Sequence, residues 1–160
     1  SMGSPVANMG NEVRAEVNRR KHQPTANHLG KTMLNLSELE GQAAIAKRCI
    51  PKVEHHTQRL VVIDGIRSLV EVDEFKKKFT HFILVAIHAS PETRYQRLFR
   101  RRRSDDPPDW KTFMERDLRE LRIGMGSVIS VADYMIVNEG SIGKLKQKIM
   151  RRMREVLTNK

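Results

Sequence analysis

The stretch Leu60-Val-Val-Ile-Asp-Gly-Ile-Arg-Ser68 decides the fold, because a continuous apolar run leads straight into a carboxylate, a glycine and an arginine. Such a run is typical of a strand buried on both faces, as in a parallel sheet covered by helices. Asp64 would then stand at the carboxyl end of the strand, where open α/β sheets bind ligands and an aspartate can orient Mg²⁺ or its water. Arg67 would lie in the crevice just beyond. Both residues have a structural alternative, since many strands end in Asp and Arg67 suits a surface salt bridge.

Strands and helices alternate along the rest of the chain. Two further apolar runs, Phe82–Ile87 and Tyr134–Val137, are predicted as strands, and Pro5–Gly10 as a short one. The predicted helices, marked by caps and apolar stripes, cover residues 11–21, 25–36, 37–53, 69–79, the segment after 90–91, 109–121 and 142–156. This order predicts an α/β fold of three layers, α/β/α, around a parallel sheet. We expect residues 1–160 to form a single domain.

The tripeptide Gly30-Lys-Thr32 matches the end of a Walker A loop, G-x-x-x-x-G-K-[ST], which grips phosphate after a buried strand. The match fails, because Thr25 rather than Gly stands five residues before Gly30 and no apolar strand precedes it. The apolar stripe within Leu29–Leu36 predicts a helix here, with Thr25 as its cap. Ser37 and Glu40 have the spacing of a capping box, which predicts that a new helix starts there.

The chain is strongly basic, with 30 Lys and Arg against 19 Asp and Glu and a formal net charge of +11. This favours phosphate-bearing partners such as nucleotides, other small molecules or nucleic acid, although a solvated basic face has the same composition. The single cysteine, Cys49, lies among Ala and Ile, so we expect a packed thiol rather than a nucleophile. No apolar run is long enough for a membrane span and no signal peptide is visible, so we expect a cytoplasmic protein without a membrane partner.

A basic section that includes Arg97, Arg101 and Arg103 leads to the pair Asp105-Asp106. The forked guanidinium groups suit bidentate binding of phosphate. The alternative is a solvated charge run, which is the usual interpretation of such a segment.

As a set, these motifs resemble a nucleotide kinase of the P-loop class. Val62–Ser68 is similar to the D-G-x-x-R stretch of adenylate kinases, and Arg97–Asp106 resembles their lid. Ala132–Ser141 resembles the last strand and the adenine-side loop of dephospho-coenzyme A kinases. From Pro5 onward the chain is similar to an archaeal family of adenylate-kinase-like and dephospho-coenzyme-A-kinase-like ATPases of poorly defined substrate.

The resemblance implies ATP- and Mg²⁺-dependent phosphoryl transfer to a nucleotide or a CoA-precursor-like acceptor, with a lid-like segment at about residues 100–120. The implied site residues are catalytic Asp64, Arg101 and Arg103, with Asp64 also near the metal; acceptor-binding Asn11, Arg14 and Arg67; and nucleotide-binding Arg97, Asn138 and Gly140. Two positions depart from the family pattern: Asn11 stands where the family usually has Asp, and Ser37–Glu40 replaces an Arg-Glu-Glu-like segment.

The resembled family begins with a strand, a G-x-x-G-x-G-K-S-type loop and a helix, and this chain begins at what resembles the second strand. We therefore expect the fold without its first, central strand and P-loop, and little or no kinase activity from this chain. A second hypothesis is a non-catalytic basic protein that binds RNA or another polyanion. A third is a folded fragment without activity.

The first strand of the resembled fold lies between the strands that end at Asp64 and Ile87. Buried unpaired backbone groups cost about 1–3 kcal/mol each, so we expect no open gap there. Direct pairing of these two strands is the favoured outcome. A homodimer is the next, and insertion of Pro5–Met9 between the strands is a third.

Overall fold

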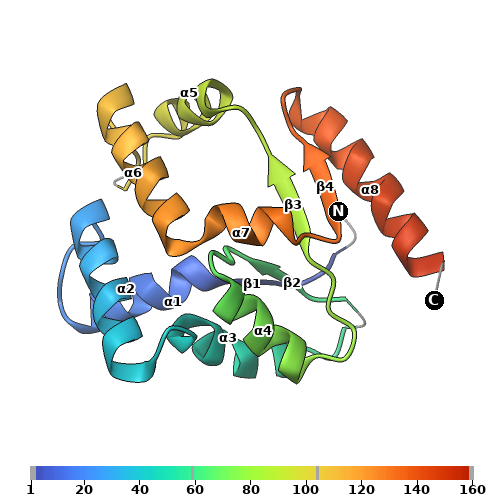
Figure 1. The fold of residues 1–160 in the computed structure, drawn as a ribbon, viewed down its shortest axis with the longest axis horizontal. Coiled ribbons are helices and arrows are strands. Elements are labelled where there is room, and N and C mark those ends of the chain that lie inside the picture. The colour runs from blue at the N-terminus through green and yellow to red at the C-terminus, as the bar shows by residue number, and fades with distance from the viewer. Residues whose placement is uncertain (1–2, 59, 104, 159–160) are drawn as a thin grey trace.

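The computed structural model describes residues 3–58, 60–103 and 105–158, so that Ser104, within the predicted lid-like segment, lies outside the described residues. Short strands and helices alternate along the chain (Figure 1). The strands are β1 (Val6–Asn8), β2 (Val62–Asp64), β3 (Val85–His88) and β4 (Tyr134–Val137). The helices are α1 (Met9–Arg19), α2 (Ala26–Glu40), α3 (Ala44–Glu54), α4 (Leu69–Lys78), α5 (Pro91–Arg101), α6 (Trp110–Ile123), α7 (Met125–Ser130) and α8 (Ile142–Thr158).

The strands form two separate parallel pairs. β1 pairs with β2, with Ala7 opposite Ile63, and β3 pairs with β4, with Ile87 opposite Ile136. In Figure 1, β1 and β2 cross the middle of the molecule, and β3 and β4 run towards α5 and the start of α8. The prediction of an α/β fold with parallel strands is confirmed. The single sheet of a three-layer fold is not formed among the described residues.

The predicted direct pairing of the strands at Asp64 and Ile87 is wrong. Within residues 3–58, 60–103 and 105–158, β2 pairs only with β1, and β3 only with β4. Insertion of Pro5–Met9 between these strands is also wrong, since β1 pairs with β2 alone. The prediction that these strands are buried on both faces fails as well, because Val62 is 43% and Ile87 is 52% exposed. The homodimer stays a prediction.

The physical reason lies in α4, whose side chains serve two cores. Phe75 is fully buried in the core that underlies β1 and β2, where it packs with residues of α1, α2 and α3. One turn earlier, Val72 packs with Leu84, just before β3, and with Val128 of α7. Leu84 leads directly into β3, and Ile66 and Phe82 pack against both clusters, so the packing of α4 fixes where β3 begins relative to β1 and β2.

Local signals in the sequence set most helix starts correctly. The side chains of Thr25, Ser90 and Asp109 cap α2, α5 and α6 by accepting backbone N–H groups, as predicted. The predicted helix start at Ser37 is wrong, because both Ser37 and Glu40 lie within α2. α2 also contains Gly30-Lys-Thr32, which confirms that this tripeptide is helical.

Cys49 lies fully buried in the core beneath β1 and β2. Burial raises the pKa of its thiol to about 11. A protonated, enclosed thiol packs as a small apolar group, as the sequence predicted.

Glu16 on α1 ties helices together through three arginines. Its carboxylate lies 2.8 Å from Arg19, 2.8 Å from Arg20 and 3.2 Å from Arg48 of α3, and its side chain is only 2% exposed. Hydrogen bonds from Arg19 and Arg20 lower the pKa of Glu16 to about 2, although burial acts in the opposite direction. Arg48 also binds Glu40 at the end of α2, so the network joins α1, α2 and α3.

We expect Glu16→Gln to lower the free energy of unfolding by about 2 kcal/mol at pH 7, because it removes charge-assisted hydrogen bonds from a buried acceptor. The folded pKa of about 2 lies below the ordinary value of 4.5. The carboxylate therefore stabilises the fold fully above pH 5, and this contribution fades as the pH falls towards 2. Urea unfolding of both proteins between pH 7 and pH 2 measures this.

Glu38→Gln is the matched control, since Glu38 is exposed and has no ion-pair partner among the described residues. It should leave stability within about 0.5 kcal/mol of the original. A Glu16→Gln deficit that stays constant down to pH 2 would contradict the assignment.

Candidate functional site

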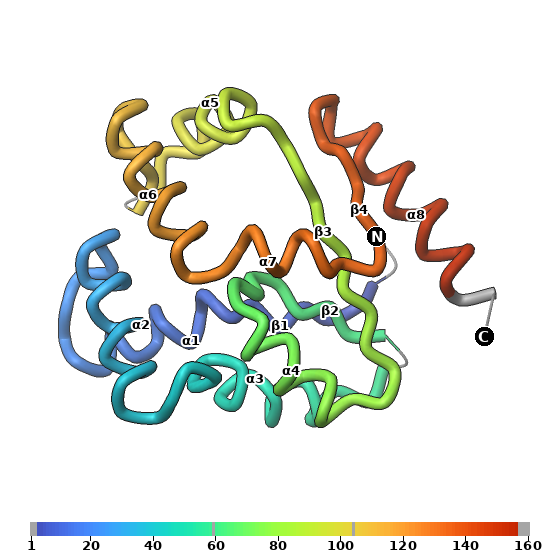
Figure 2. Tube along the Cα trace, in the orientation of Figure 1, coloured from blue at the N-terminus to red at the C-terminus, as the bar shows by residue number. Residues whose placement is uncertain are grey.

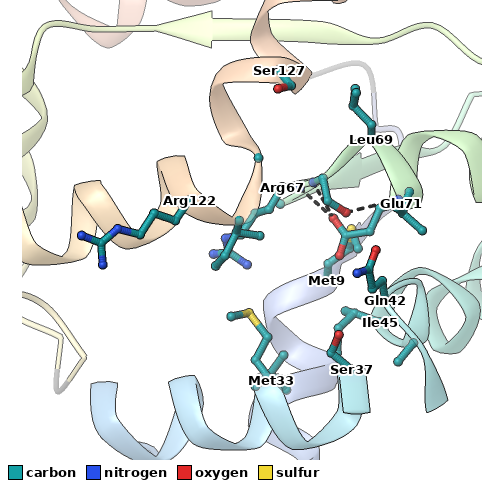
Figure 3. A pocket seen from close by; sticks show the side chains of 17 residues that line it. Met9, Met33, Ser37, Gln42, Ile45, Arg67, Leu69, Glu71, Arg122 and Ser127 are labelled. Carbon is teal, nitrogen blue, oxygen red and sulfur yellow. Dashed lines mark hydrogen bonds between the residues drawn. The ribbon is translucent and has the colours of Figure 1, made fainter. Parts of the chain in front are cut away.

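A cavity of about 470 Å³ opens beside the carboxyl ends of β1 and β2, and we call it the Arg67 pocket (Figure 3). Its apolar wall is formed by α1, α2 and α3, with Met9, Val13, Met33, Ala44 and Ile45. Its opposite wall comes from the loop after β2 and from the junction of α6 and α7, with Gly65, Arg67, Ser68, Leu69, Val70, Glu71, Arg122, Ile123, Gly124 and Ser127. Ser37 and Gln42 complete the lining. The pocket therefore combines an apolar side with a side rich in polar groups.

The loop after β2 is held in one conformation by Gly65 and by a capping box. Gly65 has φ +100°, and a Cβ there would lie 3.6 Å from the Cβ of Met9, so the loop passes close to the start of α1. Ser68 accepts a hydrogen bond from the backbone N–H of Glu71, and the Glu71 carboxylate accepts the N–H groups of Arg67 (2.7 Å) and Ser68 (3.2 Å). Burial raises the pKa of Glu71, and these hydrogen bonds oppose the rise. The side chain of Arg67 is thus projected from a fixed backbone.

Arg67 and Arg122 are two arginines in the lining of the pocket. Figure 3 shows the Arg122 side chain extending outward along α6, beyond Arg67, with Met33 of α2 below Arg67. The Nε of Arg67 lies 2.5 Å from Oε2 of Glu120 on α6, yet neither atom makes a hydrogen bond. The contact is therefore an ion pair with poor alignment. Arg122 has no ion-pair partner within the part of the chain that the structure describes.

The other predicted acceptor residues lie around the start of α1. The Nη2 of Arg14 lies 2.9 Å from Oδ2 of Asp105, and its Nη1 lies 3.1 Å from the position of a Cβ on Gly10. Gly10 in turn adjoins Gly65, since a Cβ on Gly65 would lie 3.9 Å from the Gly10 backbone nitrogen. Arg14 and Arg67 therefore flank the same junction of β1, β2 and α1. Asn11 is exposed and does not line the pocket.

Asp64 ends β2 as predicted, and it also lies outside the pocket lining. Its Oδ2 accepts a 2.7 Å hydrogen bond from the Asn8 amide, which at the same time caps α1 through Oδ1. The carboxylate is exposed, and its Oδ1 has no protein partner among the described residues. One exposed carboxylate oxygen suits Mg²⁺, which usually keeps several waters and takes its other ligands from phosphate. The described residues contain no group of three or more His, Cys, Asp or Glu that could hold a metal ion without such help.

The three predicted nucleotide-binding residues meet at one place. Arg97 on α5 donates hydrogen bonds to the backbone carbonyls of Asn138 (2.8 Å) and Gly140 (3.0 Å). Beside them, the Glu139 carboxylate accepts hydrogen bonds from Ser90 and Thr93 at the start of α5. These contacts fasten the loop after β4 to α5. Their use in binding a nucleotide stays a prediction.

The structure does not bring Arg101 and Arg103 into the Arg67 pocket. Arg101 donates to the Asp106 carboxylate through Nε at 3.0 Å, and the backbone N–H of Arg103 donates to the same carboxylate at 2.8 Å. The hydrogen bond from Arg101 lowers the pKa of Asp106 against the effect of burial. Their predicted catalytic roles stay untested.

Sequence reasoning missed Glu71, Glu120 and Arg122. The capping-box spacing of Ser68 and Glu71 could have revealed the first. Glu120 and Arg122 carried no such signal, because only the fold brings the end of α6 beside the loop after β2.

Comparisons with known proteins identify the family to which the chain belongs. Residues 1–113 match a family model described as an AAA domain. The chain is thus a P-loop NTPase-like, kinase-like nucleotide-binding protein.

Relatives from three archaea identify a more specific family. A UPF0200 protein of Staphylothermus marinus is 43% identical over 141 residues, which cover 88% of this chain and 74% of the relative. UPF0200 proteins of Hyperthermus butylicus and Pyrococcus furiosus are each 43% identical over 151 residues, covering 94% and 92% of this chain and 81% of each relative. The chain belongs to the UPF0200 family.

We expect Gly10→Ala to disturb the site without unfolding the protein. The new methyl group would lie 3.0 Å from Oδ1 of Asn8 and 3.1 Å from Nη1 of Arg14, so both side chains must shift. The N–H resonances of Asn11 and Asp105 should move in NMR spectra.

Gly30→Ala serves as the control, since its methyl group would meet nothing closer than 3.5 Å. That change should stabilise α2 by about 0.5–1 kcal/mol, the usual gain for alanine over glycine in a helix. Unchanged resonances in Gly10→Ala would show that Arg14 does not lie over α1 as described.

Proposed function

We propose that this chain binds a phosphate-bearing nucleotide or a CoA-precursor-like molecule in the Arg67 pocket, as the acceptor side of a P-loop kinase-like protein. The observation that carries the proposal is that two arginines, Arg67 and Arg122, and an apolar wall line the same cavity. Guanidinium groups bind phosphate oxygens in a bidentate manner. Met33 and Ile45 offer an apolar surface for a base or a similar flat group.

The place of the pocket in the fold supports the same proposal. It opens at the carboxyl ends of two parallel strands, which is where α/β sheets bind ligands. Asp64 stands at the end of β2 with one carboxylate oxygen available to Mg²⁺ or its water. When bound, ATP and Mg²⁺ would supply the phosphoryl group and neutralise its charge, and Arg101 and Arg103 are our candidates for residues facing the phosphates.

The cellular location is also a proposal. No helix among the described residues is long and apolar enough to cross a membrane. We keep the cytoplasm as the proposed location because the single cysteine, Cys49, is a free, buried thiol.

We expect Arg122→Ala to weaken binding of adenosine monophosphate several-fold, and Arg67→Ala to weaken it about tenfold, or about 1.4 kcal/mol. Calorimetric titration of the probe measures both. Arg122 is the cleaner variant, since its removal leaves no protein carboxylate unpaired. Arg100→Ala removes the same charge from an exposed site outside the pocket, so its affinity should equal the original.

Equal affinity in all four proteins would refute an acceptor site in this pocket. If oligonucleotides bind instead, with steep salt dependence and no effect of either pocket variant, the hypothesis of a non-catalytic polyanion-binding protein gains support.

We further expect the 160-residue chain to hydrolyse or transfer phosphate from ATP at a negligible rate. The sequence contains no G-x-x-x-x-G-K-[ST], whose backbone N–H groups and lysine hold the β- and γ-phosphates. Release of inorganic phosphate from ATP and Mg²⁺ is the measurement. Turnover in a pure preparation that disappears in Asp64→Ala would overturn this expectation.

A further inference from the structure

Both arginines that flank the junction of β1, β2 and α1 are engaged by carboxylates from one stretch of chain. Arg14 pairs with Asp105 at 2.9 Å, and Arg67 pairs with Glu120 at 2.5 Å. Asp105 lies shortly before α6 begins, and Glu120 lies near the end of α6. Figure 2 shows this part of the chain arching away after β3 and returning towards α1 and α2 through α6.

Further close contacts position α6 beside the pocket. Arg116 donates a 3.3 Å hydrogen bond to the Asp105 carbonyl, which fixes the loop before α6 to the helix itself. A Cβ on Gly30 of α2 would lie 3.5 Å from the Arg119 guanidinium, and a Cβ on Gly124 would lie 3.5 Å from the Arg67 carbonyl. The Arg119 side chain of α6 therefore reaches α2, and the end of α6 at Gly124 lies beside the loop after β2.

We propose that Asp105 and Glu120 form a carboxylate latch, which holds α6 over the pocket by occupying Arg14 and Arg67, and that a phosphate-bearing ligand binds by displacing these carboxylates. The inference rests on the proposed function, since it concerns regulation of the same pocket. In the latched form the two carboxylates take the places of phosphate oxygens on the guanidinium groups.

The quality of the two contacts favours displacement. The Arg67–Glu120 pair places Nε and Oε2 in buried positions without a hydrogen bond to either, so a better-aligned acceptor would satisfy groups that are unsatisfied in the latch. Arg14 is held through one nitrogen, Nη2. A phosphate dianion offers three oxygens and about twice the charge of a carboxylate, which suits forked binding by both arginines.

The end of α6 provides the point of movement that the latch requires. Gly124, with φ +124°, ends α6 next to the loop that carries Arg67. A glycine in this conformation allows a sharp change of direction between α6 and α7, and thus a point about which α6 can move. Aromatic packing of Tyr95 with Trp110 and Phe113 joins α5 to α6, so that the two helices would move together.

The test compares Glu120→Gln and Asp105→Asn with the original protein, using adenosine monophosphate as the probe in calorimetric titrations. Each variant removes one negative charge that competes for an arginine. We expect each to bind the probe three- to tenfold more tightly. Glu115→Gln removes the same charge from an exposed position on α6 with no ion-pair partner among the described residues, and its affinity should equal the original.

Amide hydrogen exchange gives a second readout that a merely structural ion pair would not produce. Exchange of α6 should become faster when the probe is added to the original protein, and should already be fast without probe in Glu120→Gln. In Arg67→Ala, which removes the other member of the same ion pair, exchange of α6 should also be fast without probe.

The outcomes separate the latch from the proposed function. If the probe binds, Arg67→Ala weakens it, and neither Glu120→Gln nor Asp105→Asn tightens it, the latch is wrong and the acceptor pocket stands. If no protein in the series binds the probe, both proposals fail.

Discussion

The buried carboxylate of Glu71 is the constraint on which the rest of this arrangement depends. It accepts the backbone N–H groups of Arg67 and Ser68, and so fixes both the loop after β2 and the first turn of α4. Because α4 starts where it does, Phe75 faces the core beneath β1 and β2, and Val72 faces the core beside β3. One local hydrogen-bonded motif thus sets the course of the backbone at Arg67 and the positions at which α4 enters two apolar clusters.

Electrostatic pairing organises the remainder of the molecule. With a net charge of +11, the chain has too few carboxylates to pair with all its lysines and arginines, and the placement of the carboxylates therefore carries information. Glu16, buried among three arginines, serves the packing of helices. Asp105 and Glu120 instead pair with Arg14, near the pocket, and Arg67, in its lining, whereas Arg122 in the lining has no ion-pair partner among the described residues. An arginine without an ion-pair partner among the described residues, in the same lining as one held by a poorly aligned ion pair, is the electrostatic pattern of a site for anions.

How much the sequence could predict depends on the range of the interactions involved. Caps such as Thr25 and Ser90 act within one helical turn, and both were predictable. The two capping-box spacings show the limit, because Ser68 starts a helix and Ser37 does not. An unbroken apolar stripe precedes Ser37 and continues the helix through it, whereas a strand and Gly65 precede Ser68.

Residues that act through tertiary contact were beyond this kind of reasoning. Glu120 lies 53 positions from Arg67, and nothing in the local pattern of α6 marks it as a partner. Arg97 contacts the carbonyls of Asn138 and Gly140, and only the family resemblance, not a local pattern, grouped these three residues beforehand. Sequence patterns within one helix or strand thus predict that helix or strand. The family resemblance predicts part of how the helices and strands pack together.

The failure of direct strand pairing follows from the same distinction between local and tertiary effects. The expectation assigned each unpaired backbone group the cost of a buried one, about 1–3 kcal/mol. β2 and β3 have only three and four residues, and in a parallel strand about half of the backbone groups point to each side. Their exposed side chains, including Val62 and Ile87, indicate that water reaches much of this surface. Solvated groups carry little of that cost, so the packing of Val72 and Phe75 in the two clusters that α4 joins outweighs the few hydrogen bonds that closure would add.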